Sequence, residues 1–346
     1  MRFALERLEA FVVNILVILD VLPEHAEITA LRLLDADLRG RNGHGLIRIP
    51  QYVVRIEAGG INLRPEIQLL RETPVSALVD GDNGLGQVVM TRATETAIEK
   101  ATRSGMAWVG TVHSNHAGAA GIYTALALEQ DLIGIYMAVA SANVMPPWGG
   151  SVRLLGTNPI SIAIPAGDET PLQIDIATTV TSHGTIKVVA QAGESMPEGW
   201  VIDSEGNSIT DPRKADEGFL MPIGGYKGSG LNMAIGLLAG VLNDAAFGPE
   251  VIDHRVVPGQ PANTGQAILV MRPDLFRDLQ DFKGSMDNHL RQLRESGPPG
   301  TVHIPGDGAV RLQAEQRNLG VEISPTLLDQ LRGLADRFEL HDRLDD

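Results

Sequence analysis

The chain has 346 residues, a formal net charge of −15 and no cysteine. This length suffices for one large domain or two of ordinary size, each with a buried core. A strongly negative surface repels nucleic-acid phosphates and anionic lipids, so we expect neither nucleic acid nor a membrane as a partner. The lack of cysteine excludes disulfides, thiolate metal sites and a cysteine nucleophile, and it fits a reducing cytoplasm.

The first 60 residues predict helices. The apolar run over residues 11–22 has 12 residues, whereas a membrane-spanning helix needs ~20, so we expect a core or interface helix there. Pro23 suits a helix start, and apolar residues follow it at helical spacing as far as Gly40. A further helix is expected over residues 46–57, with Pro50 in its first turn.

From residue 75 the pattern changes to short β-branched runs with helices between some of them. Strands are expected in SALVDG, MAWVGTV, LIGIYMAVA, NPISIAIP and LQIDIATT, and helices over residues 91–103, 118–129 and 226–246. Several strands adjoin without an intervening helix, so an α/β fold with a purely parallel sheet is not favoured. Residues 193–224 are expected to be long loops, and the chain after residue 269 mostly helical.

Common catalytic and nucleotide-binding motifs are missing from the sequence. No G-x-G-x-x-G is present, so the usual dinucleotide fingerprint is absent, and no P-loop, H-E-x-x-H or G-x-S-x-G occurs. His113 and His116 have the spacing of a metal-binding pair, but no carboxylate stands nearby in the sequence to complete a site. We therefore expect no metal.

One polar constellation lies between glycines in the segment GHGLIRIPQY. His44, Arg48 and Tyr52 are four residues apart, so they would share one face of a helix. The planar guanidinium suits a carboxylate, and an imidazole can transfer a proton near neutral pH. The pattern fits binding of a 2-oxo or 2-hydroxy acid. The alternative is a surface helix whose polar face is merely solvated.

Three further features suit parts of a nucleotide. Small residues follow the strand MAWVGTV in the turn after His116, where free N–H groups and a helix start favour a phosphate. Asp175 ends an apolar strand and suits a ribose hydroxyl, while Lys227 lies in a glycine tract and suits a pyrophosphate or a carboxamide. Each feature has a structural alternative. The turn after His116 would be an ordinary strand-to-helix turn, Asp175 would cap the next segment, and Lys227 would be solvated.

Six segments, taken in order, give the chain a family resemblance. They are DADLRGRNGHGLIRIPQYV, VDGDNGLGQ, SNHAGAAGIY, PWGGSVRLLGTNPISIAIP, IDIATT and PIGGYKGSGLNMAIGLLAGVLNDAAFG, and HIPGD is a weaker seventh. Together they resemble the type II malate/L-lactate dehydrogenases, also called the L-sulfolactate dehydrogenase-like family, over roughly residues 24–334. Relatives include ureidoglycolate dehydrogenase, 2,3-diketo-L-gulonate reductase and Δ1-piperideine-2-carboxylate reductase.

The resemblance implies a non-Rossmann α/β fold, with a mixed, largely antiparallel sheet and flanking helices, in a cytoplasmic homodimer. It implies a helical domain (residues 1–72, packing with the C-terminal helices of residues 272–346) and an NAD(P)-binding and catalytic domain (residues 73–271). The implied activity is hydride transfer between the nicotinamide of NAD or NADP and C2 of a small 2-hydroxy or 2-oxo acid. A ureidoglycolate-type or cyclic imino-acid substrate, or a non-catalytic relative, is the alternative.

The resemblance also assigns residues. The family's acid/base histidine falls on His44, its substrate arginine on Arg48, and a second histidine, the other candidate proton donor, on His116. The cofactor positions fall on His116, Ala117, Gly118, Ala119, Ala120, Ser141, Thr157, Asp175, Ile176, Ala177, Lys227, Gly228, Pro305, Gly306 and Asp307. The chain departs from the family at Gly43, where a serine is usual, and at Asp307, where a glutamate is usual.

Overall fold

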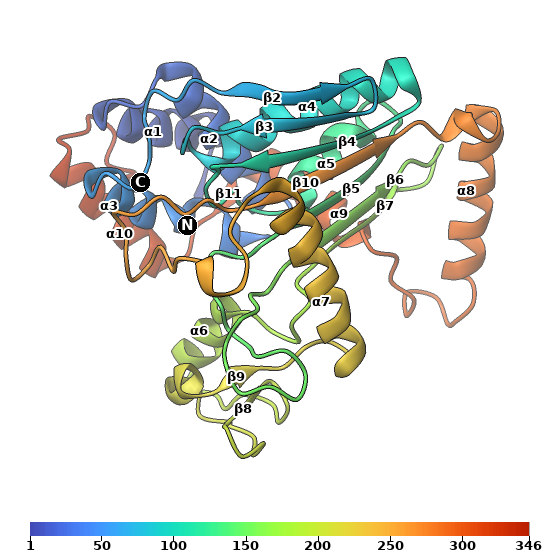
Figure 1. Ribbon diagram of the computed structural model, residues 1–346. Coiled ribbons are helices and arrows are strands. Elements are labelled where there is room, and N and C mark those ends of the chain that lie inside the picture. Colours follow the sequence, from blue (N-terminus) through green and yellow to red (C-terminus); the bar gives the residue numbers. More distant parts are fainter. Residues whose placement is uncertain (346) are drawn as a thin grey trace.

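The centre of the fold is a seven-stranded sheet with the order β2-β3-β4-β10-β5-β6-β7, seen in a computed structural model that describes residues 1–345 (Figure 1). Every neighbouring pair is antiparallel except β3 and β4, which are parallel. The predicted mixed, largely antiparallel sheet is therefore confirmed. The strands are β2 (Gln68–Thr73), β3 (Ser76–Asp80), β4 (Met106–Val112), β5 (Ile133–Ala138), β6 (Ile160–Ile164), β7 (Leu172–Ile176) and β10 (Gln266–Met271).

Helices cover both faces of this sheet. Helices α4 (Gly86–Ser104) and α5 (Gly121–Leu128) pack on one face, and α7 (Tyr226–Ala239) lies across the other (Figure 1). The contact of α4 is made with small side chains, since Ala93, Ala97 and Ala101 are fully buried at a spacing of four. Small residues at such a contact bring the helix axis close to the strands. The N-terminus of α5 lies beside the edge strand β7, because the N–H of Gly121 donates to Asp175.

The N-terminal helices share an apolar core with the last helix of the chain. These helices are α1 (Leu5–Ile18), α2 (Pro23–Leu38), α3 (Ile49–Glu57) and α10 (Pro325–Arg337). Strand β1 (Arg2–Phe3) pairs with β11 (Val321–Glu322), which joins the two ends of the chain. The helix expected over residues 11–22 is found only as far as Ile18, as the second half of α1, whose apolar face is buried. Within residues 1–345 no helix is both long and apolar enough to cross a bilayer.

Two further parts complete the molecule. Helix α9 (Asp307–Leu319) packs on α2, whereas α8 (Leu279–Arg294) lies beside the loop between β6 and β7, whose N–H groups donate to Asp287. A small lobe with its own apolar core contains α6 (His183–Ala192), β8 (Val201–Ile202) and β9 (Phe219–Leu220) (Figure 1). Short 3₁₀ turns span Asn42–His44, Leu46–Arg48, Pro212–Glu217, Val241–Asn243, Gly248–Glu250 and Pro273–Leu275. The division into domains at residues 72 and 272 stays a prediction.

The structure differs from the sequence expectations at several elements. The central strand β10 was not expected. Its run QAILVM is apolar throughout and lacks the alternation typical of a strand, because β10 is covered on both faces. The helix expected over residues 226–246 ends at Ala239, where the Asn243 side chain donates to the Ala239 carbonyl and replaces the next helical turn. Strand β2 and helix α6 were not expected. Helix α6 lies just before the segment expected to be loops, which holds only β8, β9 and one 3₁₀ turn.

Candidate active site

Three imidazoles from distant parts of the chain meet at one place, and we call them the imidazole cluster: His44, His116 and His254. The rings of His44 and His116 are stacked, with centroids 5.6 Å apart and planes inclined by 23°. The ring of His254 meets His116 edge-on, at 5.9 Å and 89°. The site thus gathers two predicted histidines and a third that the sequence did not single out.

The loop that carries His44 is pinned to the end of α2 by a buried carboxylate. Asp37 Oδ2 accepts the backbone N–H of Leu46 at 2.8 Å. A Cβ at Gly45 would lie 2.1 Å from Asp37 Oδ1, so only glycine lets the loop approach this closely. Burial raises the pKa of Asp37 to about 7. The loop is therefore held against α2 directly after His44.

His44, Arg48 and Tyr52 come from three successive segments rather than from one helix face. His44 ends the first 3₁₀ turn, Arg48 ends the second, and Tyr52 lies in α3. Gly45 separates the turns with a non-helical backbone (φ −94°, ψ −140°), so the expected helix over residues 46–57 starts as α3 only at Ile49. The Tyr52 hydroxyl nevertheless reaches the imidazole cluster, 2.8 Å from His116 Nδ1.

The guanidinium of Arg48 lies beside the imidazole cluster and is only partly satisfied. Its Nε donates to the carbonyl of Gly43 at 2.7 Å, and its Nη1 donates to Gln51 Oε1 at 3.3 Å. Within residues 1–345 its Nη2 makes no hydrogen bond. One side of the planar fork is therefore open to an anionic group such as a carboxylate.

Burial and positive charge keep the imidazoles neutral. Burial, together with the positive charge of nearby arginines that include Arg48, lowers the pKa of His44 to about 3 and that of His254 to about 3. The pKa of His116 also lies well below its usual range, mainly because of burial. At neutral pH the cluster is uncharged, so a ring nitrogen without a proton can accept one from a bound hydroxyl.

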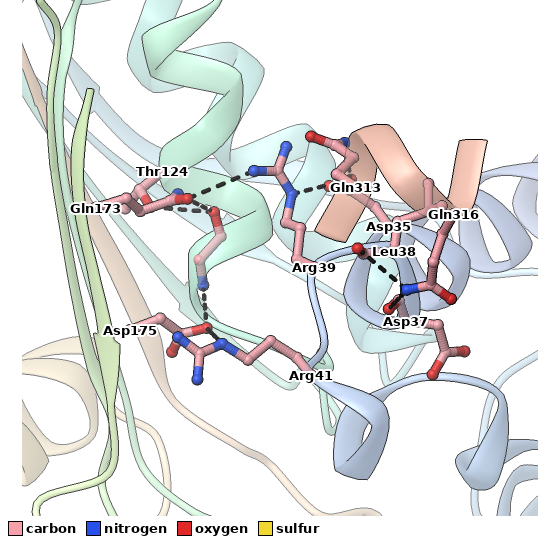
Figure 2. Close-up of polar contacts among 11 residues, drawn as sticks. Asp35, Asp37, Leu38, Arg39, Arg41, Thr124, Gln173, Asp175, Gln313 and Gln316 are labelled. Carbon is pink, nitrogen blue, oxygen red and sulfur yellow. Dashed lines mark hydrogen bonds and ion pairs between the residues drawn. The ribbon is translucent and has the colours of Figure 1, made fainter. Parts of the chain in front are cut away.

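A charged cleft with a volume of about 290 Å³ opens at the N-terminus of α5. It is lined by Arg39, Arg41, Gly121, Ile122, Gln173, Asp175, Ile304, Pro305, Gly306, Gly308 and Ala309. Asp175 Oδ2 accepts the N–H of Gly121 at 3.0 Å and lies 3.6 Å from Arg41 Nε (Figure 2). Burial raises the pKa of Asp175. The side chain of Arg41 makes no hydrogen bond within the described chain apart from this ion pair, and it is 44% exposed.

The cleft is held in shape by the junction of α2 and α9. Gln316 of α9 donates to the backbone carbonyls of Asp37 and Leu38, which end α2 (Figure 2). Arg39 donates through Nε to Asp35 at 3.0 Å, and its Nη1 lies 3.5 Å from Gln173 Oε1. Arg39 is thus held by two side chains, whereas the more exposed Arg41 is held only by its longer ion pair with Asp175.

The structure connects the cluster and the cleft through the turn after β4. This turn spans residues 116–120 and begins at the imidazole cluster with His116. It leads to Gly121, whose N–H donates to the Asp175 carboxylate in the cleft. Pro305 and Gly306 lie at the cleft as well. The predicted residues Ala117, Gly118, Ala119 and Ala120 therefore lie between the two places.

Three other predicted cofactor residues, Ser141, Thr157 and Asp307, do not line the cleft. The carbonyl of Thr157 accepts the N–H of Thr178, so Thr157 lies beside the segment that contains Ile176 and Ala177. Ser141 follows β5 in a half-buried loop. The carboxylate of Asp307 is paired with Arg294 at 2.8 Å and does not line the cleft.

Of the two predicted cofactor residues at the start of α7, Lys227 is exposed and Gly228 is buried. Lys227 is exposed, and no hydrogen bond or ion pair of its side chain is found in residues 1–345. A Cβ at Gly228 would lie 1.8 Å from the carbonyl of Ile223, so close packing alone demands glycine there. Backbone bonds between Ile223 and Thr178 hold this loop next to the end of β7. Lys227 therefore adjoins the predicted cofactor path without lining the cleft.

Several residues of the site escaped the sequence reasoning. His254 is a lone histidine in a loop, and nothing in its neighbourhood distinguishes it from a surface residue. Gln87 lies in the matching segment VDGDNGLGQ but carries no charge that would attract notice. Arg39 and Arg41 flank Gly40 just before the predicted site loop, and this density of cations was a usable signal for an anion site.

Comparisons with known proteins agree with this arrangement. The family model described as malate/L-lactate dehydrogenase matches residues 3–332. A malate/(S)-sulfolactate dehydrogenase of Methanothermus fervidus is 37% identical over 335 residues, which cover 97% of each chain. The solved structure of a sulfolactate dehydrogenase from Methanocaldococcus jannaschii superposes with a TM-score of 0.89 at 35% identity and covers 98% of both chains.

The names of two further relatives state a cofactor. A ureidoglycolate dehydrogenase of Escherichia coli K12, 34% identical over 93% of each chain, is named for NAD(+). A (2R)-3-sulfolactate dehydrogenase of Chromohalobacter salexigens, 32% identical over 90% of this chain and 91% of its own, is named for NADP(+). A family match over nearly the whole length, with relatives above 30% identity, leaves one conclusion. The chain belongs to the malate/L-lactate dehydrogenase family of oxidoreductases.

Proposed function

We propose that the chain is an NAD(P)-dependent dehydrogenase in which Arg48 binds the carboxylate of a small 2-hydroxy or 2-oxo acid and the imidazole cluster handles the proton at C2. The observation that carries this proposal is the half-open guanidinium of Arg48 beside three neutral imidazoles. Two of these rings, His44 and His254, bury an Nδ1 that has no partner among the described residues. Such a site offers one anion clamp and several groups for an oxygen that gains or loses a proton.

The residues present fit the cofactor. The charged cleft offers Asp175 for ribose hydroxyls and Arg41 for a phosphate, and the turn of small residues at the start of α5 leaves backbone N–H groups near the path between cleft and cluster. Bound NAD(P) would supply the hydride acceptor at its nicotinamide ring. We assign the adenosine half to the cleft and the nicotinamide half to the neighbourhood of His116.

The chain's own groups perform the remaining work. In the oxidation direction Arg48 orients the substrate through its carboxylate, and a neutral imidazole of the cluster accepts the proton of the C2 hydroxyl. The hydride leaves C2 as this proton leaves oxygen, so a 2-hydroxy acid becomes a 2-oxo acid. Desolvation around the cluster strengthens the hydrogen bonds to the reacting oxygen. In the reduction direction the same imidazole returns the proton.

A simple assay tests the proposed function and separates the substrate classes. Purified protein is mixed with NADH or NADPH and a panel of oxaloacetate, pyruvate, sulfopyruvate and Δ1-piperideine-2-carboxylate, and loss of cofactor absorbance is followed. Oxidation of ureidoglycolate is measured in the opposite direction. Turnover of a 2-oxo acid supports the proposal. Turnover of only the cyclic imino acid or ureidoglycolate would move the substrate to the alternative class, and no turnover with any of them would favour a non-catalytic relative.

We also propose that the chain forms a homodimer. Helix α7 and the turn after it present a row of exposed apolar side chains: Leu231, Leu237, Leu238, Val241 and Leu242, the last with 62% of its surface exposed. Exposed apolar patches of this kind are typical of protein–protein interfaces. Light scattering behind size exclusion should give twice the chain mass, and Leu242→Glu should shift it toward the monomer. The cytoplasmic location stays a prediction.

A further inference from the structure

A chain of hydrogen bonds runs from α4 through α3 to the imidazole cluster. Gln87, in the first turn of α4, donates through Nε2 to the hydroxyl oxygen of Tyr52 at 2.6 Å. That hydroxyl lies 2.8 Å from Nδ1 of His116. Gln87 and Tyr52 are buried, with exposed fractions of 0% and 3%. Water therefore does not compete for these two bonds.

The direction of this chain follows from counting donors. A tyrosine hydroxyl has a single hydrogen. Because its oxygen already accepts the amide N–H of Gln87, the hydrogen is available for Nδ1 of His116, and the backbone carbonyl of His116 is a poorer acceptor at 3.4 Å. An Nδ1 that accepts a hydrogen bond carries no proton. A neutral imidazole must then carry its proton on Nε2.

The amide of Gln87 could in principle be turned over, but its surroundings oppose this. Its Oε1 is buried and has no hydrogen-bond partner in residues 1–345. Turning the amide would place an NH₂ group there, which would leave two buried donors unpaired instead of one acceptor. Burial also raises the pKa of Tyr52 to about 12, so the hydroxyl keeps its hydrogen throughout the neutral range.

We propose that Gln87 and Tyr52 are positioning residues that fix His116 as the Nε2-protonated tautomer, so that His116 donates a hydrogen bond to the C2 oxygen and His44 alone exchanges the proton. The role of the C2 oxygen rests on the function proposed above. In this tautomer the outward nitrogen of His116 already has its hydrogen, so it cannot accept the hydroxyl proton during oxidation.

The contrast with His44 supports this division of labour. Nδ1 of His44 is buried without a partner among the described residues, so no hydrogen bond holds the proton of this ring on one nitrogen. The two rings are stacked with centroids 5.6 Å apart, which is close enough for both to serve one substrate oxygen. During oxidation His44 would accept the hydroxyl proton, and NAD(P), when bound, would supply the acceptor for the hydride from C2. His44 later releases that proton to water.

The direct test is the ¹⁵N spectrum of histidine-labelled protein, assigned with His116→Gln. Wild-type His116 should show a protonated Nε2 and a bare Nδ1. In Gln87→Glu the carboxylate would accept the Tyr52 hydrogen, so the Tyr52 oxygen would accept from Nδ1 and the tautomer should reverse. Gln68→Glu makes the same chemical change on an exposed residue of β2 and should leave the spectrum unaltered. A wild-type ring protonated on Nδ1, or an unchanged tautomer in Gln87→Glu, would overturn the proposal.

Kinetics supply the second readout, with Tyr52→Phe as a near-isosteric variant should Gln87→Glu fold poorly. Either change should lower kcat ~10-fold or more while the cofactor KM stays within about twofold, since a donor to the reacting oxygen is lost or inverted. His116→Gln keeps an N–H donor and should retain more activity than His116→Phe. Equal activity of these two His116 variants would contradict a donor role. The NMR result stands even if no acid is turned over, so it separates this inference from the proposed function.

Discussion

The imidazole cluster and the charged cleft differ in whether their polar groups have partners. In the cleft the charges have partners: Arg39 is bonded to Asp35, and Arg41 lies 3.6 Å from Asp175. In the cluster the rings are neutral, and two buried Nδ1 atoms have no partner within residues 1–345. Because its charges are already compensated, the cleft is preorganised for a ligand. A cluster with unused hydrogen-bonding atoms is suited to a reaction in which a proton changes place.

The two regions are separated by one short turn. His116 belongs to the cluster, and Gly121, five residues later, bonds the carboxylate that lines the cleft. Because the start of α5 is fixed on the sheet by buried small residues, the distance between the two regions is fixed as well. Variants on either side should therefore separate proton transfer from cofactor binding, and the expected effects can be ranked.

The largest effect is expected from His44→Gln. The amide keeps a hydrogen-bonding group but cannot exchange a proton, so kcat should fall ~10²–10⁴-fold with little change in cofactor affinity. His116→Gln should lower kcat less, because it keeps a donor. Steady-state kinetics with both variants measure this. An active His44→Gln beside an inactive His116→Gln that still binds cofactor would reverse the assignment.

Arg48→Lys comes next and tests the carboxylate clamp. Lysine keeps the charge but loses the planar fork, so kcat/KM for the acid should fall ~10²-fold, a loss of about 3 kcal/mol in transition-state binding. The cofactor dissociation constant should be unchanged. Arg103→Lys, on the exposed end of α4, is the matched control and should behave like wild type. Near-normal turnover in Arg48→Lys would remove this residue from the substrate site.

These residues also show which parts of the fold and of the site could be predicted from the sequence. The family segments predicted the fold, and they singled out His44, Arg48 and His116, which the structure places close together. The helix drawn through His44, Arg48 and Tyr52 was wrong because Gly45 takes a non-helical conformation against Asp37, a tertiary contact 8 residues away that no local pattern reveals. His254 could not be predicted, since its place depends on a loop folding over the site. Whether Lys227 contacts the cofactor stays a prediction, because its side chain is exposed beside the path.

A smaller effect is expected at the charged cleft from Arg41→Gln. The Arg41 side chain makes no hydrogen bond within residues 1–345, so the fold should be intact, while Asp175 would lose the positive charge that compensates its carboxylate. We expect the dissociation constant of the cofactor to rise ~10-fold, more for NADPH than for NADH, with kcat at saturating cofactor within about threefold. Fluorescence titration with both cofactors measures this. Equal affinities in variant and wild type would exclude Arg41 from the cofactor site.

The smallest effect concerns stability in mild acid, and its sign follows from the buried groups of the imidazole cluster and of Asp37, which holds the loop of His44. Burial lowers the pKa of His254 to about 3 and that of His44 to about 3, whereas histidine in an unfolded chain titrates near ~6.5. Between these values the unfolded state binds more protons, so stability falls as the pH falls below ~6.5. Asp37 acts the other way, because its pKa is raised to about 7 in the folded state, and its contribution falls as the pH rises from ~4 toward 7.

Thermal or urea unfolding between pH 7.5 and pH 5 tests this balance. Wild type should lose stability toward pH 5, and His254→Gln should reduce that loss by about 1–2 kcal/mol, because one buried neutral imidazole no longer resists protonation. Asp37→Asn, which keeps an oxygen for the Leu46 N–H, should make the loss steeper by removing the opposing group. His303→Gln changes an exposed histidine outside the cluster and should leave the profile of wild type. If His254→Gln also followed the wild-type profile, His254 would have to titrate alike in the folded and the unfolded protein, and the buried neutral imidazole assigned to this position would be wrong.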